Sequence, residues 1–216
     1  MTMRRWAIVA AGLTAVAGVT IGIVTLTGRQ AASPRPSPSA SAPPSSALPS
    51  ETTTSSLSPV PSPPEGFVEF RNEKVGFAVS YPKDWKVLEV ADDPQVDLLA
   101  TLNQRDSFLV RVVPLGIDIG PSEFPGMTSV TNQIVNSGED IKVITGPQQI
   151  QVGGLPGYFY LYTFTDKGQK GAHSHYFLFK DDTMITLVFQ AMPEDQFEKR
   201  APVFDQIANS FRVLPN

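Results

Sequence analysis

Two histidines, His173 and His175, stand two positions apart, and the chain has no others. Side chains two residues apart on a strand point to the same face, so this pair could chelate a metal ion. A metal site needs three or four converging ligands, and only Asp166 or the Asp181-Asp182 pair could approach the histidines. The sequence places no third ligand with them, and we predict no metal site.

The surroundings of the histidines favour a structural role. Their face of the expected strand continues into Phe177 and Phe179, so the pair is best interpreted as capping a strand against the core. Ser174 lies between them, but neighbours on a strand point to opposite faces, so the three residues do not form a catalytic triad.

An acidic stretch is a second candidate site. Asp92, Asp93 and Asp97 could offer oxygens to calcium, but calcium takes six to eight oxygens and the stretch lacks an EF-hand spacing with its turning glycine. We predict a solvated loop. With no cysteine, the chain can have no disulfide, thiolate metal site or cysteine nucleophile.

An aromatic stripe could serve as a ligand platform, but aromatic side chains more often supply core area. Tyr158, Tyr160, Tyr162 and Phe164 alternate on one face of an expected strand. We predict that this stripe packs against the C-terminal helix.

The motifs of common enzymes are missing from the sequence. It contains no G-x-S-x-G, no H-E-x-x-H and no G-x-x-x-x-G-K. We predict no catalytic, cofactor-binding or metal-binding residue. The alternative is a hydrolase or other enzyme acting on an envelope polymer, because a pair of catalytic carboxylates leaves no local signature.

The N-terminal segment, residues 1–30, predicts a cytoplasmic tip and a transmembrane anchor. Arg4 and Arg5 precede a run without charge from Trp6 to Leu26, and about 20 apolar residues span a bilayer as a helix. The basic pair keeps the N-terminus in the cytoplasm and exports the rest. A cleaved signal peptide is the alternative, although its apolar core is usually shorter.

Residues 31–64 predict a disordered stalk. Between Ser33 and Pro64 there are 10 Pro and 11 Ser residues, too few apolar groups to offset the entropy of ordering. In a polyproline II conformation at about 3.1 Å per residue, the stalk would reach on the order of 100 Å.

Residues 65–216 predict one folded domain. They hold 13 Lys and Arg against 20 Asp and Glu, a formal charge of −7. An acidic domain without a basic cluster argues against binding nucleic acid or an anionic lipid surface.

Alternating apolar residues predict strands throughout this domain. The last three expected strands are joined by short turns and so form an antiparallel meander. The expected strands cover 67–70, 77–81, 85–90, 96–102, 108–113, 141–152, 158–165, 173–179 and 184–191, with a turn at 153–157 and loops at 103–106 and 166–171.

Helices are expected in two places. Met127, Val130 and Ile134 mark a short amphipathic helix that ends near Gly138. An apolar stripe also runs from residue 197 to 211, and Pro202 within it predicts a short turn over 194–199 followed by a helix that starts near residue 201. Strands followed by a packing helix predict an α+β fold.

Three stretches together carry a family resemblance. They are the G-F-A-V-S-Y-P-K-D-W run at 76–85, the G-G-L-P-G turn at 153–157 with the aromatic meander that follows, and F-D-Q-I-A-N-S-F at 204–211. Their order and spacing resemble the PsbP-like superfamily, which includes the Ran-binding Mog proteins and the LpqN-type envelope lipoproteins of actinobacteria.

The resemblance implies an antiparallel sheet sandwiched between helices and mostly non-enzymatic roles. It suggests a membrane-anchored, extracytoplasmic binding or assembly module of the cell envelope, whose partners are the membrane and an envelope protein. LpqN-type proteins carry a lipidated cysteine, which this chain lacks, so an uncleaved helix would anchor it instead. The sequence has no residue pattern specific to the photosystem subunits, so the resemblance does not imply photosystem binding.

Overall fold

The computed structural model describes residues 62–215. The predicted anchor, and the predicted stalk up to residue 61, lie outside the described residues. Within residues 62–215 no helix has the length and hydrophobicity needed to cross a membrane.

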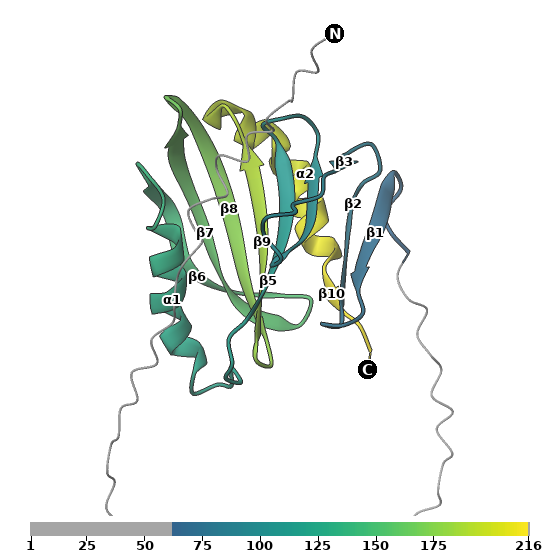
Figure 1. The fold of residues 1–216 in the computed structure, drawn as a ribbon, viewed down its shortest axis with the longest axis vertical. Helices are drawn as coiled ribbons and strands as arrows, with labels where there is room; N and C mark the ends of the chain where they lie inside the picture. Colours follow the sequence, from purple (N-terminus) through teal and green to yellow (C-terminus); the bar gives the residue numbers. More distant parts are fainter. Residues whose placement is uncertain (1–61, 216) are drawn as a thin grey trace, which may run out of the picture. The chain divides into compact units, whose positions relative to one another are not determined.

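Two antiparallel sheets make up the domain (Figure 1). The larger has seven strands in the order β3-β4-β5-β9-β8-β7-β6, and the smaller has the order β1-β2-β10. The strands are β1 (Phe67–Asn72), β2 (Phe77–Pro82), β3 (Lys86–Val87), β4 (Val96–Thr101), β5 (Ser107–Pro114), β6 (Lys142–Val152), β7 (Leu155–Asp166), β8 (Gln169–Lys180), β9 (Thr183–Ala191) and β10 (Arg212–Val213).

The predicted meander is confirmed, because β7, β8 and β9 pair in sequence order with antiparallel register. Strands β4 and β5 pair with each other as an antiparallel hairpin around the loop predicted at 103–106. The turn before β7 is tighter than predicted: only Gly153 and Gly154 turn, with φ of 57° and 87°, and Leu155 already belongs to the strand. The strand predicted over 85–90 is also shorter, since only Lys86 and Val87 pair with β4.

The main core lies between the large sheet and helix α2 (Phe197–Ser210), which also contacts β2 of the small sheet. Phe204 is 2% exposed and packs against Trp85 and Phe189, with ring centroids 6.4 and 5.1 Å away. The same core includes Phe77 and Val79 of β2, so its burial joins the two sheets into one domain.

Helix α2 corrects the predicted break at Pro202. The short 3₁₀ turn η3 covers Glu194–Gln196, and α2 then runs unbroken from Phe197 with Pro202 inside it. A proline removes one backbone hydrogen bond of the helix. Here Phe197 contacts Phe204 at 5.4 Å, so packing of the aromatic stripe holds the first turn in place.

A second core lies on the opposite face of the large sheet, under α1 (Met127–Val135) and the 3₁₀ turn η2 (Phe124–Gly126). The aromatic stripe of β7 packs here, so the predicted contact with the C-terminal helix is wrong. Register explains the difference: Tyr160 pairs with His175 and thus faces away from Leu187 and Phe189, which meet α2. Tyr158 stacks on Phe124 at 4.7 Å instead.

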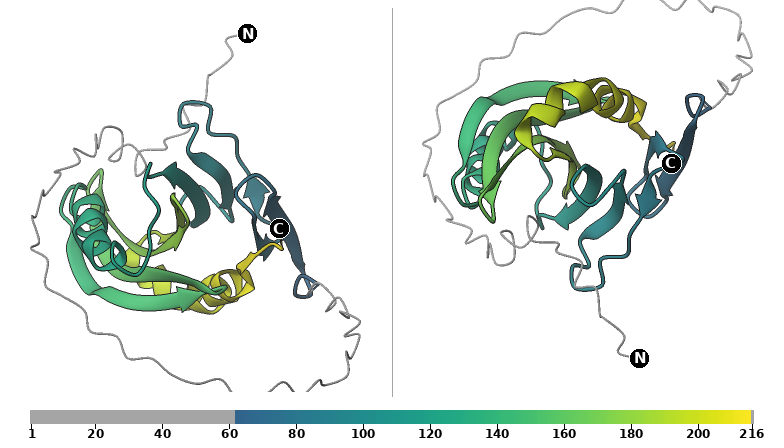
Figure 2. Two further views of the ribbon diagram at one scale, coloured as in Figure 1. Left: turned by 90° about the horizontal axis from the view of Figure 1, so that it is seen from below. Right: turned by 90° about the horizontal axis from the view of Figure 1, so that it is seen from above.

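The two helices therefore cover opposite faces of the large sheet, which agrees with the predicted α+β sandwich. Figure 2 shows that this sheet is strongly curved. Strand β6 forms one edge, and its pairing with β7 shifts register twice between Val143 and Gln148.

Candidate functional site

The two histidines and Tyr162 form a buried cluster on the α1 face of the sheet. His173 is 7% exposed and His175 is 9% exposed. The Tyr162 hydroxyl lies between them, 3.1 Å from His173 Nδ1 and 2.9 Å from His175 Nε2. We call these three residues, together with Gln190, the histidine–tyrosine network.

The donor and acceptor of each hydrogen bond in this network can be assigned, starting from Gln190. Gln190 Nε2 donates to the Arg105 carbonyl over 3.0 Å, so its Oε1 faces His173 Nε2 at 2.8 Å and accepts a hydrogen bond from it. The neutral His173 then accepts at Nδ1 from Tyr162, whose oxygen accepts from His175 Nε2. His175 Nδ1 is left as a lone pair, and it is buried with no hydrogen-bond partner among residues 62–215.

Burial keeps both imidazoles neutral. It lowers the pKa of His173 to about 4, although the Gln190 hydrogen bond partly opposes the shift. Burial also lowers the pKa of His175 well below its usual value, and repulsion of its protonated form by protonated His173 and by Arg111 lowers the pKa further. The pKa of the Tyr162 hydroxyl is raised by burial. None of these three groups changes its protonation near pH 7.

The acidic residues considered as further ligands lie elsewhere. Asp181 pairs with Lys180 over 2.9 Å, and Asp182 accepts from the Thr183 hydroxyl over 3.0 Å. Across the described part of the chain, no three His, Cys, Asp or Glu side chains are grouped so that they could hold a metal ion. The histidines are thus not joined by Asp166, Asp181 or Asp182 in a site.

The predicted solvated acidic loop needs a correction. Asp93 forms an ion pair with Arg111, with 2.5 Å between Oδ2 and Nη2, and Arg111 is only 8% exposed. Asp97 belongs to β4 and accepts a hydrogen bond from Asn72. Asp93 therefore fixes the β3–β4 connection to β5, and Asp97 connects β4 with the end of β1.

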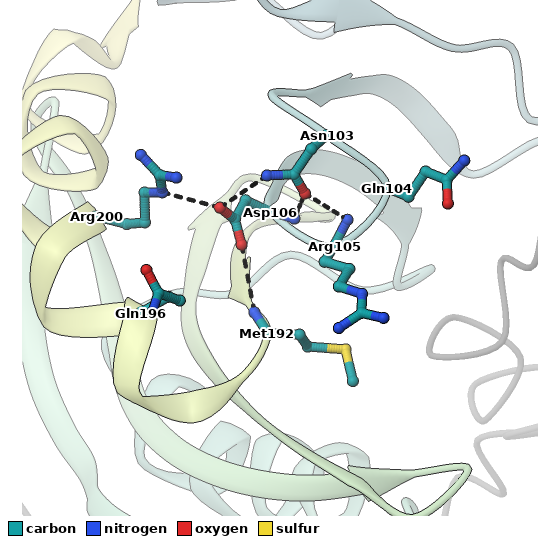
Figure 3. Close-up of a pocket in the computed structure, with 7 residues that line it drawn as sticks. All are labelled: Asn103, Gln104, Arg105, Asp106, Met192, Gln196 and Arg200. Carbon is teal, nitrogen blue, oxygen red and sulfur yellow. Dashed lines mark hydrogen bonds and ion pairs between the residues drawn. The ribbon is translucent and has the colours of Figure 1, made fainter.

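A buried carboxylate on the β4–β5 loop forms a second polar centre (Figure 3). Asp106 is 2% exposed. Its Oδ2 accepts from Arg200 Nε over 2.9 Å and from Asn103 Nδ2 over 3.1 Å, and its Oδ1 accepts from the Met192 amide over 3.3 Å. These contacts satisfy the carboxylate and join the loop to β9 and α2.

A surface pocket of about 370 Å³ lies above this carboxylate. Polar side chains dominate its wall, with one thioether among them (Figure 3). We call it the Asp106 pocket, and its lining residues are Asn103, Gln104, Arg105, Asp106, Met192, Gln196 and Arg200. Sequence reasoning expected the loop but not the pocket. The available signal was Asn103 three positions before Asp106, a pattern typical of an Asx turn.

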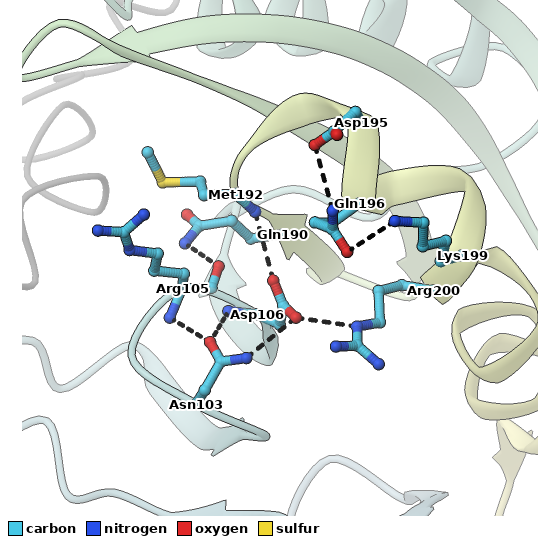
Figure 4. A network of polar contacts seen from close by, with 9 residues as sticks. All are labelled: Asn103, Arg105, Asp106, Gln190, Met192, Asp195, Gln196, Lys199 and Arg200. Carbon is cyan, nitrogen blue, oxygen red and sulfur yellow. Dashed lines mark hydrogen bonds and ion pairs between the residues drawn. The ribbon is translucent and has the colours of Figure 1, made fainter.

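The pocket and the histidine–tyrosine network are connected through Gln190. Its amide donates to the Arg105 carbonyl at the pocket and accepts from His173 in the interior (Figure 4). Asn103 Oδ1 accepts from the amides of Arg105 and Asp106 over 2.7 and 2.8 Å, which fixes the loop that carries the carbonyl. The interior network therefore helps to position the pocket wall.

A seven-stranded antiparallel sheet between two helices, with a small sheet beside it, defines an α+β domain of the PsbP-like class. The chain belongs to the PsbP family, whose profile matches residues 65–213. The resemblance found in the sequence is thereby confirmed. No match was found among curated proteins.

Solved structures share the fold at low identity. The cyanobacterial PsbP (CyanoP) of Synechocystis sp. PCC 6803 is 18% identical with a TM-score of 0.51, covering 68% of this chain and 92% of its own. LpqN of Mycobacterium tuberculosis, described as involved in cell envelope biogenesis, is 13% identical with a TM-score of 0.51, covering 69% and 91%. At these identities the likeness establishes the fold alone.

Proposed function

We propose that this chain is a membrane-anchored, extracytoplasmic binding or assembly module of the cell envelope that does not catalyse a reaction. The observation that carries the proposal is that the polar groups in the interior of the domain are mostly hydrogen-bonded to other groups of the same chain. Those of the histidine–tyrosine network are neutral and bonded mainly to one another, and the Asp106 carboxylate is saturated by donors from its own chain. Apart from Ser80 Oγ, His175 Nδ1 and Thr186 Oγ1, which are buried without a hydrogen bond among residues 62–215, the polar side-chain groups left for a partner lie at the surface.

The buried histidines are poor candidates for catalysis. A general base should have a pKa near the working pH and should reach a proton on the substrate. The pKa of His173 is about 4, and both of its ring nitrogens already have partners. The one unpartnered ring nitrogen, His175 Nδ1, is buried, and burial lowers the pKa of His175 well below its usual value.

Placement in the envelope is supported by two features of different kinds. The uncharged run from Trp6 to Leu26 behind Arg4 and Arg5 supports an anchor with the domain outside. The shared fold with LpqN, a protein involved in envelope biogenesis, favours the same compartment by analogy. A tether of this kind raises the effective concentration of the domain near membrane partners.

The proposal is tested by photo-crosslinking in intact cells. A photoreactive residue is placed in the full chain, one position at a time, at exposed sites around the domain such as Lys74, Gln104 and Gln149. We expect a discrete adduct in the membrane fraction from some positions and none from the others. The matched control is the same scan in Phe204→Asp, in which an unfolded domain should lose the adduct.

Two results would contradict the proposal. One is a scan in which no position gives an adduct above the level of the unfolded control. The other is purified full chain that shortens an envelope polymer, with the activity lost in a carboxylate variant, because that result would establish the enzyme alternative.

A further inference from the structure

One arginine of the domain has no ion-pair partner within residues 62–215. Four of its five arginines are paired, namely Arg71, Arg111, Arg200 and Arg212. Arg105 is the exception: it is exposed and lies at the Asp106 pocket. The domain has a formal charge of −7, so an arginine without an ion-pair partner marks a point where a negatively charged group of a ligand could bind.

A second guanidinium reaches the same pocket from the other side. Arg200 uses Nε to bind Asp106, and this single bond orients the planar group. Its two terminal amino groups have no hydrogen bond within residues 62–215 and can still donate to a carboxylate as a parallel pair. Because buried Asp106 holds it, this guanidinium is ordered before any ligand binds.

The two arginines do not converge. Figures 3 and 4 both place Arg105 and Arg200 on opposite sides of Asp106, with their guanidinium groups directed apart. One small anion is therefore not shared between them. A ligand that uses both must be extended and must carry at least two negative groups.

The thioether of Met192 favours one class of extended anion over another. Met192 lines the pocket, and both close-ups show its side chain on the Arg105 side. Methionine offers an adaptable apolar contact. An acidic peptide can place an apolar side chain there, whereas an anionic polysaccharide gains nothing from the thioether. Gln104 adds an exposed amide that suits a peptide backbone, whereas the Gln196 amide is already bonded to Asp195 and Lys199.

We propose that the Asp106 pocket binds an extended acidic peptide segment of a partner protein, with carboxylates at Arg105 and Arg200 and an apolar side chain on Met192. This inference rests on the proposed binding function and adds the chemistry of the partner. The attraction is local, because it comes from two arginines in a domain that is otherwise acidic.

The test uses purified full chain in mild detergent and a fluorescein-labelled peptide of alternating glutamate and leucine. Binding is followed by fluorescence anisotropy at low salt. We expect Arg105→Ala to raise Kd about three- to tenfold, the range for one charge-assisted contact at a partly exposed site. Arg105→Glu should raise it further. Lys142→Ala, on the edge strand β6 three strands away from β9, removes the same charge outside the pocket and should leave Kd unchanged.

Several outcomes would overturn the inference. They are no binding by the parent chain at low salt, equal Kd for the parent and Arg105→Ala, an equal loss with Lys142→Ala, and tighter binding of polyglucuronate or inorganic phosphate than of the peptide. Crosslinked adducts in cells combined with any of these results would preserve the binding module and reject this pocket. Peptide binding without adducts would reject the module in cells instead.

Discussion

Arg200 and Asp106 lie 94 positions apart, and Arg200 Nε donates to Asp106 Oδ2 over 2.9 Å. The carboxylate is 3% exposed as a side chain and the arginine 32%. The pair joins the β4–β5 loop to α2, and the Met192 amide adds the end of β9. One buried charge thus sets the relative position of three segments that meet at the pocket.

Removal of this carboxylate should be costly. Asp106→Ala leaves Arg200, the Asn103 amide and the Met192 amide without their acceptor, and loss of a buried acceptor typically costs about 1–3 kcal/mol. Urea denaturation should show that loss in the free energy of unfolding, whereas Asp84→Ala, at an exposed turn, should change it by less than about 0.5 kcal/mol. Equal effects of the two variants would show that Asp106 does not join the segments.

Stability should fall in mild acid. The folded pKa of His173 is about 4, below the unfolded value of about 6.5, so the unfolded chain binds the proton first. No loss is expected above pH 6.5. Between pH 6.5 and 4 the free energy of unfolding should fall by on the order of 3 kcal/mol from this residue, and the lowered pKa of His175 adds in the same direction.

The matched variant for this titration is His173→Gln, which keeps a polar side chain but cannot take up the proton. Its unfolding free energy should decline less steeply over the same interval, although its stability at pH 7 is lower because two hydrogen bonds change. A slope identical to that of the parent would show that His173 is not the group responsible.

The packing of α2 can be tested at Phe204. This ring is 2% exposed and contacts aromatic rings on both sides, so Phe204→Ala should destabilise the domain by about 3–5 kcal/mol. Chemical denaturation followed by tryptophan fluorescence suits the measurement, because Trp85 is one of the contacts. Glu198→Ala, on the exposed side of the same helix, is the control. A loss below about 1 kcal/mol for Phe204→Ala would contradict this packing.

The predicted anchor gives a topology test. The positive charges at Arg4 and Arg5 predict a cytoplasmic N-terminus, so protease added to intact spheroplasts should remove the domain and leave a small membrane fragment. A mature N-terminus near Ser33, found by mass spectrometry, would show that the segment is cleaved as a signal peptide.

Local patterns predicted most of the fold. Alternation over 158–165 and 184–191 placed two long strands and their meander, because strand periodicity depends only on neighbouring residues. The stripe through Phe197 and Phe204 likewise placed the helix that covers the sheet, although propensity alone wrongly broke it at Pro202.

What remained hidden depends on contacts between distant segments. Nothing near Tyr160 in the sequence shows whether its face meets α1 or α2, since that is set by the register with β8 and β9. In the sequence, Asp106 likewise resembles any other aspartate in a loop. Its burial depends on Arg200, which the fold brings beside it. The Asp106 pocket and the contact between Tyr160 and the α1 side of the sheet were thus unpredictable for the same reason, because both depend on residues far apart in the sequence.

The irregular outer edge of β6 affects whether two copies of this protein can pair through their sheet edges. Val143 and Ile144 are 38% and 56% exposed at that edge, a composition that invites aggregation through strand addition. The two register shifts and Pro147, which has no N–H to donate, interrupt the ladder that an incoming strand would need. The edge of β6 is therefore a poor template for a strand added from a second copy.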